Sequence, residues 1–304
     1  MALNLEILQV LDAIDRKGSF AAAAAKLGKV PSALTYQVRK LEGQLDALLF
    51  DRRGHRAKLT PAGQELLSEG RHLLYAADEL ERRVRRIATG WEVELRIVID
   101  CVVRIDTVLE LVREFYADKP VTRLRLFTEV LSGTWDALIA GRADLALGTF
   151  AGTPGLAGPV SGFQSRPLGE IEMVFAVAPT HPLAAAPEPL TMEEVRRHRA
   201  VAVGDSARNL PPITVGLLRN QDVLTVPSME AKVAAQIAGL GCGTLPLGMA
   251  LPHIEAGRLI PKLLSESRVA NTLHYSWRTS ERGKALLWFT KRLAEPKLRK
   301  ALLP

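Results

Sequence analysis

Polar and cationic side chains share one side of residues 31–45, a segment whose apolar spacing predicts a helix. Its hydroxyl groups are those of Ser32, Thr35 and Tyr36, and its cations are Arg39 and Lys40. Hydroxyl groups can form hydrogen bonds with base edges, and cations can neutralise phosphate. The pattern therefore indicates contact with nucleic acid, while the plain alternative for any single helix is a solvated polar face.

A second group of cations follows this helix in residues 52–58. Leu48, Leu49 and Phe50 are predicted to enter the core, and residues 53–55 (RGH) can turn a short hairpin. A basic hairpin of this kind follows the phosphate backbone and adds affinity without reading sequence. The helix and the hairpin together give these candidate DNA-contacting residues: Ser32, Ala33, Thr35, Tyr36, Arg39, Lys40, Arg52, Arg53, His55, Arg56 and Lys58.

Three helices are predicted to position these groups, over residues 5–16, 20–27 and 31–45. Gly18 ends the first helix, Ser19 can cap the second, and Gly28 ends the second. Two short helices joined by a glycine-containing turn are typical of a helix-turn-helix. The apolar side of the third helix must pack against the first two and consists of Leu34, Val38, Leu41 and Leu45.

A long helix is predicted to begin at Thr60-Pro61 and to end near Thr89-Gly90. Leucine or isoleucine recurs in it every seven residues, with small or apolar residues between, a spacing typical of a coiled coil. We expect this helix to pair with a second copy of the chain, and the alternative is that it packs against its own domain. The repeat consists of Leu66, Gly70, Leu73, Ala77, Leu80, Val84 and Ile87.

Strand-like and helix-like segments alternate from residue 91 onward, which predicts mostly parallel sheets that bind ligands where the strands end. The expected strands are residues 94–100, 122–130, 144–150, 171–178, 200–203 and 273–277. The expected helices are residues 106–116, 134–140, 192–197, 228–238 and 284–293.

Polar and small residues at the predicted strand ends are the candidates for binding a small molecule. Hydroxyl and backbone N–H groups suit a carboxylate or phenolic oxygen, but an ionised Asp100 would repel an anion and so favours a neutral or phenolic ligand. The alternative for each residue is that it only caps a helix. The candidates are Asp100, Cys101, Val102, Thr128, Ser132, Gly133, Thr149, Gly204, Asp205, Ser206, Ser228 and Met229.

Composition and charge agree with a soluble protein of more than one domain. The chain has 304 residues, is 47% hydrophobic and 24% charged, and carries a formal net charge of +7. Residues 1–90 hold 15 Lys and Arg against 11 Asp and Glu, so the first third is basic. Two isolated cysteines and the lack of a secretory pattern in the first residues favour the cytoplasm. No catalytic residue, metal site, cofactor or membrane span is expected.

The segment GSFAAAAAKLGKVPSALTYQVRKLEGQLDALLFDRRGHRAKLTPAG resembles the DNA-binding domain of LysR-type regulators. The resemblance implies a multidomain chain of α+β and α/β parts: a winged helix-turn-helix (1–60), a linker and dimerisation helix (61–89) and a two-lobed α/β effector domain similar to periplasmic binding proteins (90–304). Lobe I is expected at about 91–165 and 270–304, and lobe II at about 166–269. The implied function is transcriptional regulation, with operator DNA, a small organic effector (an aromatic or organic acid) and a homodimer or homotetramer.

Two departures from the family pattern bear on DNA recognition. Residues 30–32 read Val-Pro-Ser where members commonly have Ser-Gln-Pro, and Tyr36 stands where they have Arg. Base contacts at these positions cannot be carried over from the family. The VPSALTY and GHR segments are similar to one enterobacterial branch of it. Two other classes remain open from sequence: a solute-binding protein of a transporter, and an α/β enzyme with an appended DNA-binding module.

Overall fold

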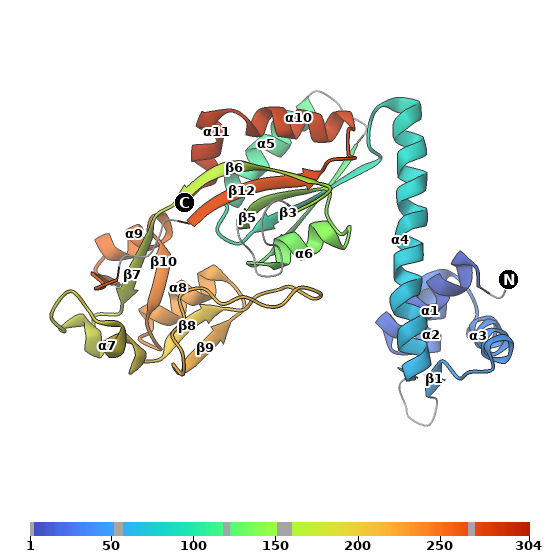
Figure 1. Cartoon of the computed structure of the whole chain (residues 1–304), viewed down its shortest axis with the longest axis horizontal. Helices are drawn as coiled ribbons and strands as arrows, with labels where there is room; N and C mark the ends of the chain where they lie inside the picture. The colour runs from blue at the N-terminus through green and yellow to red at the C-terminus, as the bar shows by residue number, and fades with distance from the viewer. Residues whose placement is uncertain (1–2, 52–56, 118–121, 151–159, 267–270) are drawn as a thin grey trace. The chain divides into compact units, whose positions relative to one another are not determined.

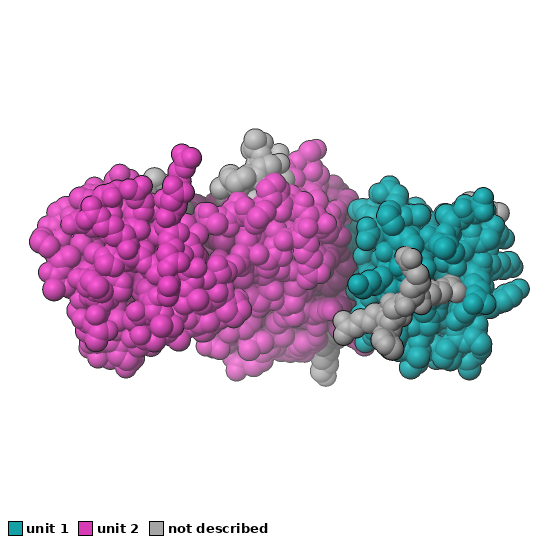
Figure 2. Space-filling view, turned by 90° about the horizontal axis from the view of Figure 1, so that it is seen from below, with its two compact units in different colours: residues 1–88 teal, residues 89–304 magenta. Residues whose placement is uncertain are grey.

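The computed structural model describes residues 3–51, 57–117, 122–150, 160–266 and 271–304. Its chain forms two compact units, unit 1 (Met1–Ala88) and unit 2 (Thr89–Pro304), shown in Figure 2. Among the described residues, no helix has the length and apolar character needed to cross a membrane.

Unit 1 is a three-helix cluster followed by a two-stranded hairpin and a long helix (Figure 1). Local signals set its boundaries: Asn4 and Ser19 cap the first two helices, and Gly18 and Gly28 end them in the left-handed conformation. The elements are α1 (Leu5–Lys17), α2 (Phe20–Leu27), α3 (Pro31–Leu45), β1 (Phe50–Asp51), β2 (Lys58–Leu59) and α4 (Pro61–Thr89).

The apolar side of α3 packs into the core of unit 1, as its spacing predicted. Leu34, Val38 and Leu41 are buried together with Leu8 and Ile14 of α1. Leu45 was predicted to join them and Leu48 was predicted to enter the core. Both predictions are wrong, because Leu45 is 39% exposed and Leu48 is 69% exposed. The helix ends at Leu45, and Asp46 turns the chain with a φ of 49°, so the last residue lies at the edge of the packed surface.

The first turns of α4 pack against unit 1 itself. Leu67 is buried, and a Cβ on Gly70 would lie 2.7 Å from a methyl carbon of Leu8. Arg71 forms ion pairs with Asp12 (2.7 Å) and Asp15 (2.8 Å) of α1. This part of α4 therefore packs against its own domain, which was the alternative to pairing with a second chain. Further along, the helix exposes three apolar side chains of the repeat: Leu73 (54%), Leu80 (56%) and Val84 (59%).

Unit 2 contains a five-stranded sheet in the order β4-β3-β5-β12-β6, here called lobe I with its helices. β3 runs parallel to β4 and β5, and β12 runs antiparallel to β5 and β6. Helices α5, α10 and α11 cover one face and α6 the other (Figure 1). The elements are β3 (Glu94–Asp100), α5 (Ile105–Ala117), β4 (Arg123–Glu129), α6 (Gly133–Ile139), β5 (Leu145–Phe150), β6 (Phe163–Ile171), β12 (Asn271–Arg278), α10 (Lys284–Leu293) and α11 (Pro296–Leu302).

Lobe II is built around β7, which pairs antiparallel with β10 and β11. β8 and β9 form a separate parallel pair, and Ala200 of β8 forms an isolated backbone β-bridge with Cys242, the residue before β10. The lobe I sheet includes β6 as far as Ile171, so it extends beyond the expected boundary near residue 166. The elements of lobe II are β7 (Met173–Val177), η1 (Pro182–Ala184), α7 (Met192–Arg196), β8 (Ala200–Val203), β9 (Val223–Val226), α8 (Met229–Ile237), β10 (Gly243–Pro246), α9 (Leu247–Glu255) and β11 (Ile260–Lys262).

Candidate DNA-binding face and effector region

The outward side of α3 carries exposed polar and cationic groups above a buried apolar side. Ser32, Arg39 and Lys40 are exposed, and Tyr36 is 68% exposed. Within the described residues, neither Arg39 nor Lys40 forms an ion pair, so both charges are available to an external anion. The face predicted from sequence is therefore present on the folded unit.

Two of the predicted base-reading positions are less accessible than expected. Ala33 and Thr35 are half-buried. The Thr35 hydroxyl donates a hydrogen bond to the carbonyl oxygen of Pro31 (3.0 Å). Because its proton is used within the helix, Thr35 retains only acceptor capacity toward another molecule.

The hairpin forms as predicted in its described part. β1 and β2 pair antiparallel, with Phe50 opposite Leu59 and Asp51 opposite Lys58. Lys58 is exposed. Four of the predicted phosphate-contacting residues lie outside the described residues: Arg52, Arg53, His55 and Arg56.

A buried carboxylate, which sequence reasoning missed, connects α3 to the hairpin. Glu42 is 7% exposed, and its Oε1 accepts hydrogen bonds from the backbone N–H groups of Leu49 (2.9 Å) and Phe50 (3.3 Å). A carboxylate that accepts backbone N–H groups makes stronger hydrogen bonds than a neutral acceptor. The signal available in the sequence was a charged residue directly beside apolar Leu41 on the inner side of the helix.

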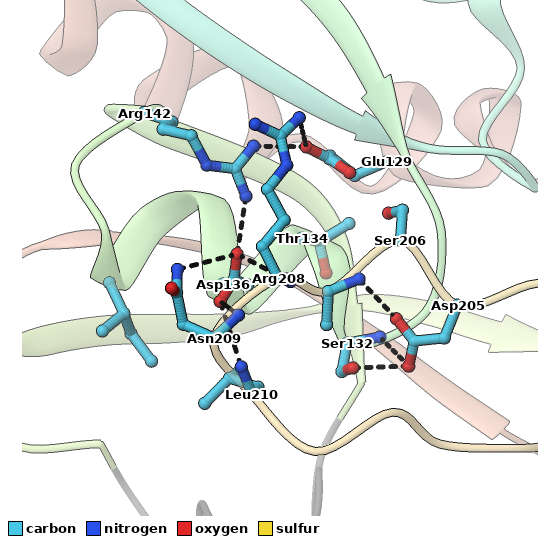
Figure 3. A network of polar contacts seen from close by, with 12 residues as sticks. Glu129, Ser132, Thr134, Asp136, Arg142, Asp205, Ser206, Arg208, Asn209 and Leu210 are labelled. Atoms are coloured by element: carbon cyan, nitrogen blue, oxygen red, sulfur yellow. Dashed lines mark hydrogen bonds and ion pairs between the residues drawn. The ribbon is translucent and has the colours of Figure 1, made fainter. Parts of the chain in front are cut away.

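Four of the effector candidates meet where lobe I contacts lobe II. Successive backbone N–H groups of the β4–α6 connection donate to side chains from two other segments: Val130 to Ser206 Oγ (2.8 Å), Leu131 to Asp100 Oδ2 (3.1 Å) and Ser132 to Asp205 Oδ2 (3.4 Å). The Ser132 hydroxyl also donates to Asp205 (Figure 3). These groups are bonded to one another, so in this state they connect the two lobes.

Gly133 allows the closest approach at this junction. A Cβ at that position would lie 2.0 Å from the Ser206 hydroxyl and 3.1 Å from a carboxylate oxygen of Glu129. Any larger residue would push the lobe II segment away. Gly133 is thus a contact residue of the junction between the lobes.

A second polar cluster at the same junction was missed from sequence. Asp136 of α6 is 2% exposed and accepts backbone N–H groups of Asn209 (2.9 Å) and Leu210 (3.2 Å) in lobe II. Arg142 donates to Asp136 (2.7 Å) and to Glu129 (Figure 3). Burial alone would raise the pKa of Asp136, but the hydrogen bonds from Arg142 and the backbone lower it below its ordinary value. The cluster therefore holds residues 208–210 against lobe I.

Four of the remaining effector candidates have structural roles within the fold. Thr149 is buried and shares a hydrogen bond with Ser276 (2.8 Å), and Ser228 caps α8 by accepting from Ala231 N–H (3.2 Å). Val102 and Met229 belong to the hydrophobic core. The last three take different positions: Thr128 is exposed on β4, whereas Cys101 and Gly204 are half-buried.

Both thiols are poorly reactive. Burial raises the pKa of Cys101 far above its ordinary value, and the neighbouring Asp100 carboxylate raises it further. Burial also raises the pKa of Cys242 to about 11. Since the thiolate is the reactive form, Cys242 is a small residue of the lobe II core rather than a redox switch.

Asp100 should make the stability of unit 2 depend on pH. Burial raises its pKa to about 7 from 3.8, against the lowering effect of hydrogen bonds from Val102 and Leu131. The folded chain therefore keeps a proton that the unfolded chain loses once the pH exceeds the ordinary value of 3.8. The resulting stability is fully present below the ordinary pKa and is lost as pH rises through about 7.

We expect the free energy of unfolding of the natural chain, minus that of Asp100→Asn, to fall between about pH 5 and 8. The slope is at most about 1.4 kcal/mol per pH unit. Urea unfolding followed by tryptophan fluorescence measures this difference, because all four tryptophans lie in unit 2: Trp91, Trp135, Trp277 and Trp288. A difference that stays constant across this range would contradict the prediction.

A helix-turn-helix with a basic hairpin, followed by a two-lobed α/β unit with polar groups at the lobe junction, defines a ligand-responsive DNA-binding regulator. Comparison with known proteins gives the same class. Residues 5–64 match the family described as bacterial regulatory helix-turn-helix protein, lysR family, and residues 88–296 match the LysR substrate binding domain. The chain belongs to the LysR family of bacterial transcriptional regulators.

Named relatives are similar in sequence to this chain along nearly its whole length. YhaJ of Escherichia coli strain K12, a probable HTH-type transcriptional regulator, is 43% identical over 301 residues, 98% of this chain and 97% of YhaJ. YeeY of the same strain is 42% identical over 285 residues, 94% of this chain and 91% of YeeY. The expected enterobacterial branch is thereby confirmed, and these relatives are regulators rather than enzymes.

Solved structures share the fold. Full-length CbnR complexed with its target DNA has a TM-score of 0.61 at 18% identity, covering 96% of this chain and 99% of CbnR. A full-length variant of OxyR from Pseudomonas aeruginosa has a TM-score of 0.58 at 18% identity, covering 98% of this chain and 97% of OxyR.

Proposed function

We propose that this regulator binds operator DNA through the outward face of α3 and its hairpin, and that a small molecule at the lobe junction controls that binding. The observation that carries the DNA part is the exposed set Ser32, Tyr36, Arg39 and Lys40 above a buried apolar side. The structure of CbnR with its target DNA supports the same use of a shared fold. A cytoplasmic location follows from the proposal, since bacterial operator DNA lies there.

In this proposal, different residues contact the bases and the phosphates of the DNA. Ser32 and Tyr36 read bases, with Ala33 and Thr35 at the edge of that surface. The cations supply salt-sensitive contacts to phosphate: Arg39, Lys40 and Lys58, with Arg52, Arg53, His55 and Arg56 of the hairpin turn.

Arg39→Ala is expected to weaken specific and non-specific DNA binding alike. Loss of one phosphate contact should lower the slope of log affinity against log salt by about 0.9. Fluorescence anisotropy of the full chain with an operator duplex and a scrambled duplex, from about 50 to 200 mM salt, measures both slopes.

Arg16→Ala is the matched control, because Arg16 is an exposed cation of unit 1 that is already paired with Asp12 (2.7 Å). Its slope should equal that of the natural chain. A change in sequence preference without a change in slope for Arg39→Ala would contradict the assignment.

For the effector we propose a small neutral or phenolic organic molecule, such as an aromatic or weak organic acid, held by Asp100, Ser132, Asp205 and Ser206. A buried carboxyl with a pKa of about 7 can donate a hydrogen bond to such a ligand when protonated. Calorimetric titration of the full chain with a panel of these compounds tests this. A hit whose affinity is unchanged by Ser206→Ala would place the ligand elsewhere.

We also propose that α4 pairs with a second chain through Leu73, Leu80 and Val84, giving a homodimer or homotetramer. These side chains are more than half exposed, and exposed apolar repeats on a long helix are typical of a helix pair. Leu80→Glu is expected to yield a monomer in light scattering at micromolar concentration. Ser68→Glu, an exposed position on the opposite side of α4, should leave the assembly intact. A natural chain that is monomeric would contradict the pairing.

A further inference from the structure

Val30 immediately precedes α3 and is an unusual residue for its position. It is the N-cap of the helix, its side chain makes no capping hydrogen bond, and that side chain is 62% exposed. Valine is among the least favoured N-cap residues, because it has no oxygen to accept a helix N–H. An exposed apolar side chain here therefore costs helix stability and gains no packing.

The other helices of unit 1 follow the ordinary rule. Asn4 accepts from Ile7 N–H (2.9 Å) at α1, Ser19 from Ala22 N–H (3.1 Å) at α2, and Thr60 from Gly63 N–H (3.1 Å) at α4. Among the described residues of this unit, only α3 begins without a capping side chain. The exception falls on the helix that carries the proposed DNA-binding face.

A second position on α3 also departs from helix preference. Gly43 lies on the outward side, in line with Ser32, Tyr36 and Arg39 at helical spacing, and it is exposed. A Cβ at Gly43 would meet nothing within 4 Å, so no contact inside the chain requires glycine. Positions that break local rules without an internal reason are expected at functional surfaces.

The exposed positive charges near this surface indicate what kind of partner it binds. Arg39, Lys40 and Lys58 are all exposed, which suits the phosphates on either side of a DNA groove. The N-terminal residues of a recognition helix are those that contact base edges in the major groove.

We propose that Val30 contacts the C5-methyl group of a thymine and thereby selects thymine at one position of each half-site. The thymine methyl is the one apolar group that the bases present in the major groove, and it matches an exposed valine. This proposal rests on the proposed function, since it requires α3 to lie in the major groove. Val30 is then a specificity-determining residue where the family motif offers a polar one.

The test removes the methyl group from the DNA and the valine from the protein separately. Operator sequences are first selected from random DNA with the full chain. Each thymine of the selected half-site is then replaced by deoxyuridine, which keeps base pairing and lacks only the methyl group. Affinities are measured at constant salt for the natural chain, for Val30→Ser and for Val215→Ser, a partly exposed valine of unit 2 (39%).

We expect one thymine per half-site at which the natural chain and Val215→Ser lose about fourfold in affinity, the effect of one methyl group removed from water. Val30→Ser should be insensitive to that replacement. Serine can cap α3, so Val30→Ser should also unfold at a higher temperature than the natural chain. If Val30→Ser no longer distinguishes thymine from deoxyuridine and is also more stable than the natural chain, the change cannot be attributed to unfolding.

Two results overturn the proposal. In one, no thymine is sensitive to loss of its methyl group. In the other, the sensitivity is undiminished in Val30→Ser, so that another residue reads the methyl. Both leave DNA binding by α3 in place, whereas a chain that selects no DNA at all would overturn the proposed function itself.

Discussion

Gly63→Ala is expected to destabilise unit 1 by about 3 kcal/mol, the upper part of the range for a residue forced into a filled space. A Cβ at Gly63 would lie 2.1 Å from the carbonyl oxygen of Leu49. That oxygen cannot move aside easily, because it accepts the Thr60 N–H (3.0 Å) and the Leu49 N–H is held by Glu42 (2.9 Å). The first turn of α4 would have to separate from the hairpin.

Gly43→Ala is the matched control in the same unit. It adds the same methyl group to a helix position with nothing within 4 Å, so it should stabilise unit 1 by about 0.8 kcal/mol through helix preference. Thermal unfolding of the full chain by far-ultraviolet circular dichroism measures both, since unit 1 contains no tryptophan. DNA affinity should fall for Gly63→Ala. Equal midpoints for the two variants would show that the close contact is relieved without cost.

Asp136→Ala is expected to destabilise unit 2 by about 3 to 5 kcal/mol, as is typical when one partner of a buried ion pair is removed. The substitution leaves Arg142 with Glu129 as its one remaining carboxylate partner among the described residues, and it leaves the N–H groups of Asn209 and Leu210 without their acceptor. Because the pKa of Asp136 is lowered in the folded chain, its contribution is present above the ordinary carboxyl pKa and is lost as pH falls below it. The natural chain should therefore lose more stability in acid than the variant does.

Asp222→Ala provides the control for this effect. The Arg199–Asp222 pair has the same 2.7 Å separation as Arg142–Asp136, but its side chains are 51% and 65% exposed. An exposed pair contributes less than about 1 kcal/mol. Urea unfolding followed by tryptophan fluorescence compares the two variants, and a similar loss for both would refute the importance of burial at the junction.

Sequence reasoning predicted unit 1 almost completely, because the signals there are local. Gly18, Ser19 and Gly28 act within one helical turn of the boundaries they set, and α2 and α3 begin and end where expected. The outward face of α3 followed from the same periodicity. Leu45 was misplaced because its burial depends on where the neighbouring helices end, which spacing within α3 does not show.

Unit 2 was predicted less well where contacts are distant in sequence. β6 was missed because its residues show no run of buried apolar side chains, and it is a strand only through pairing with β12, about a hundred residues later. α9 was missed because Pro252 lies inside it. α11 was missed too. Asp136 was not a candidate, since its partners Asn209 and Leu210 lie in another lobe.

The two hydrogen bonds of Glu42 have a consequence for how operators can vary. They join α3 to the start of β1 inside the core of unit 1, so the recognition helix and the first strand of the hairpin behave as one rigid body. In the proposed complex with DNA, a base contacted by α3 and a phosphate contacted from the start of the hairpin would therefore keep a constant spacing within a protomer. We expect sites of different total length to be accommodated by a change in the distance between half-sites rather than in the width of a half-site.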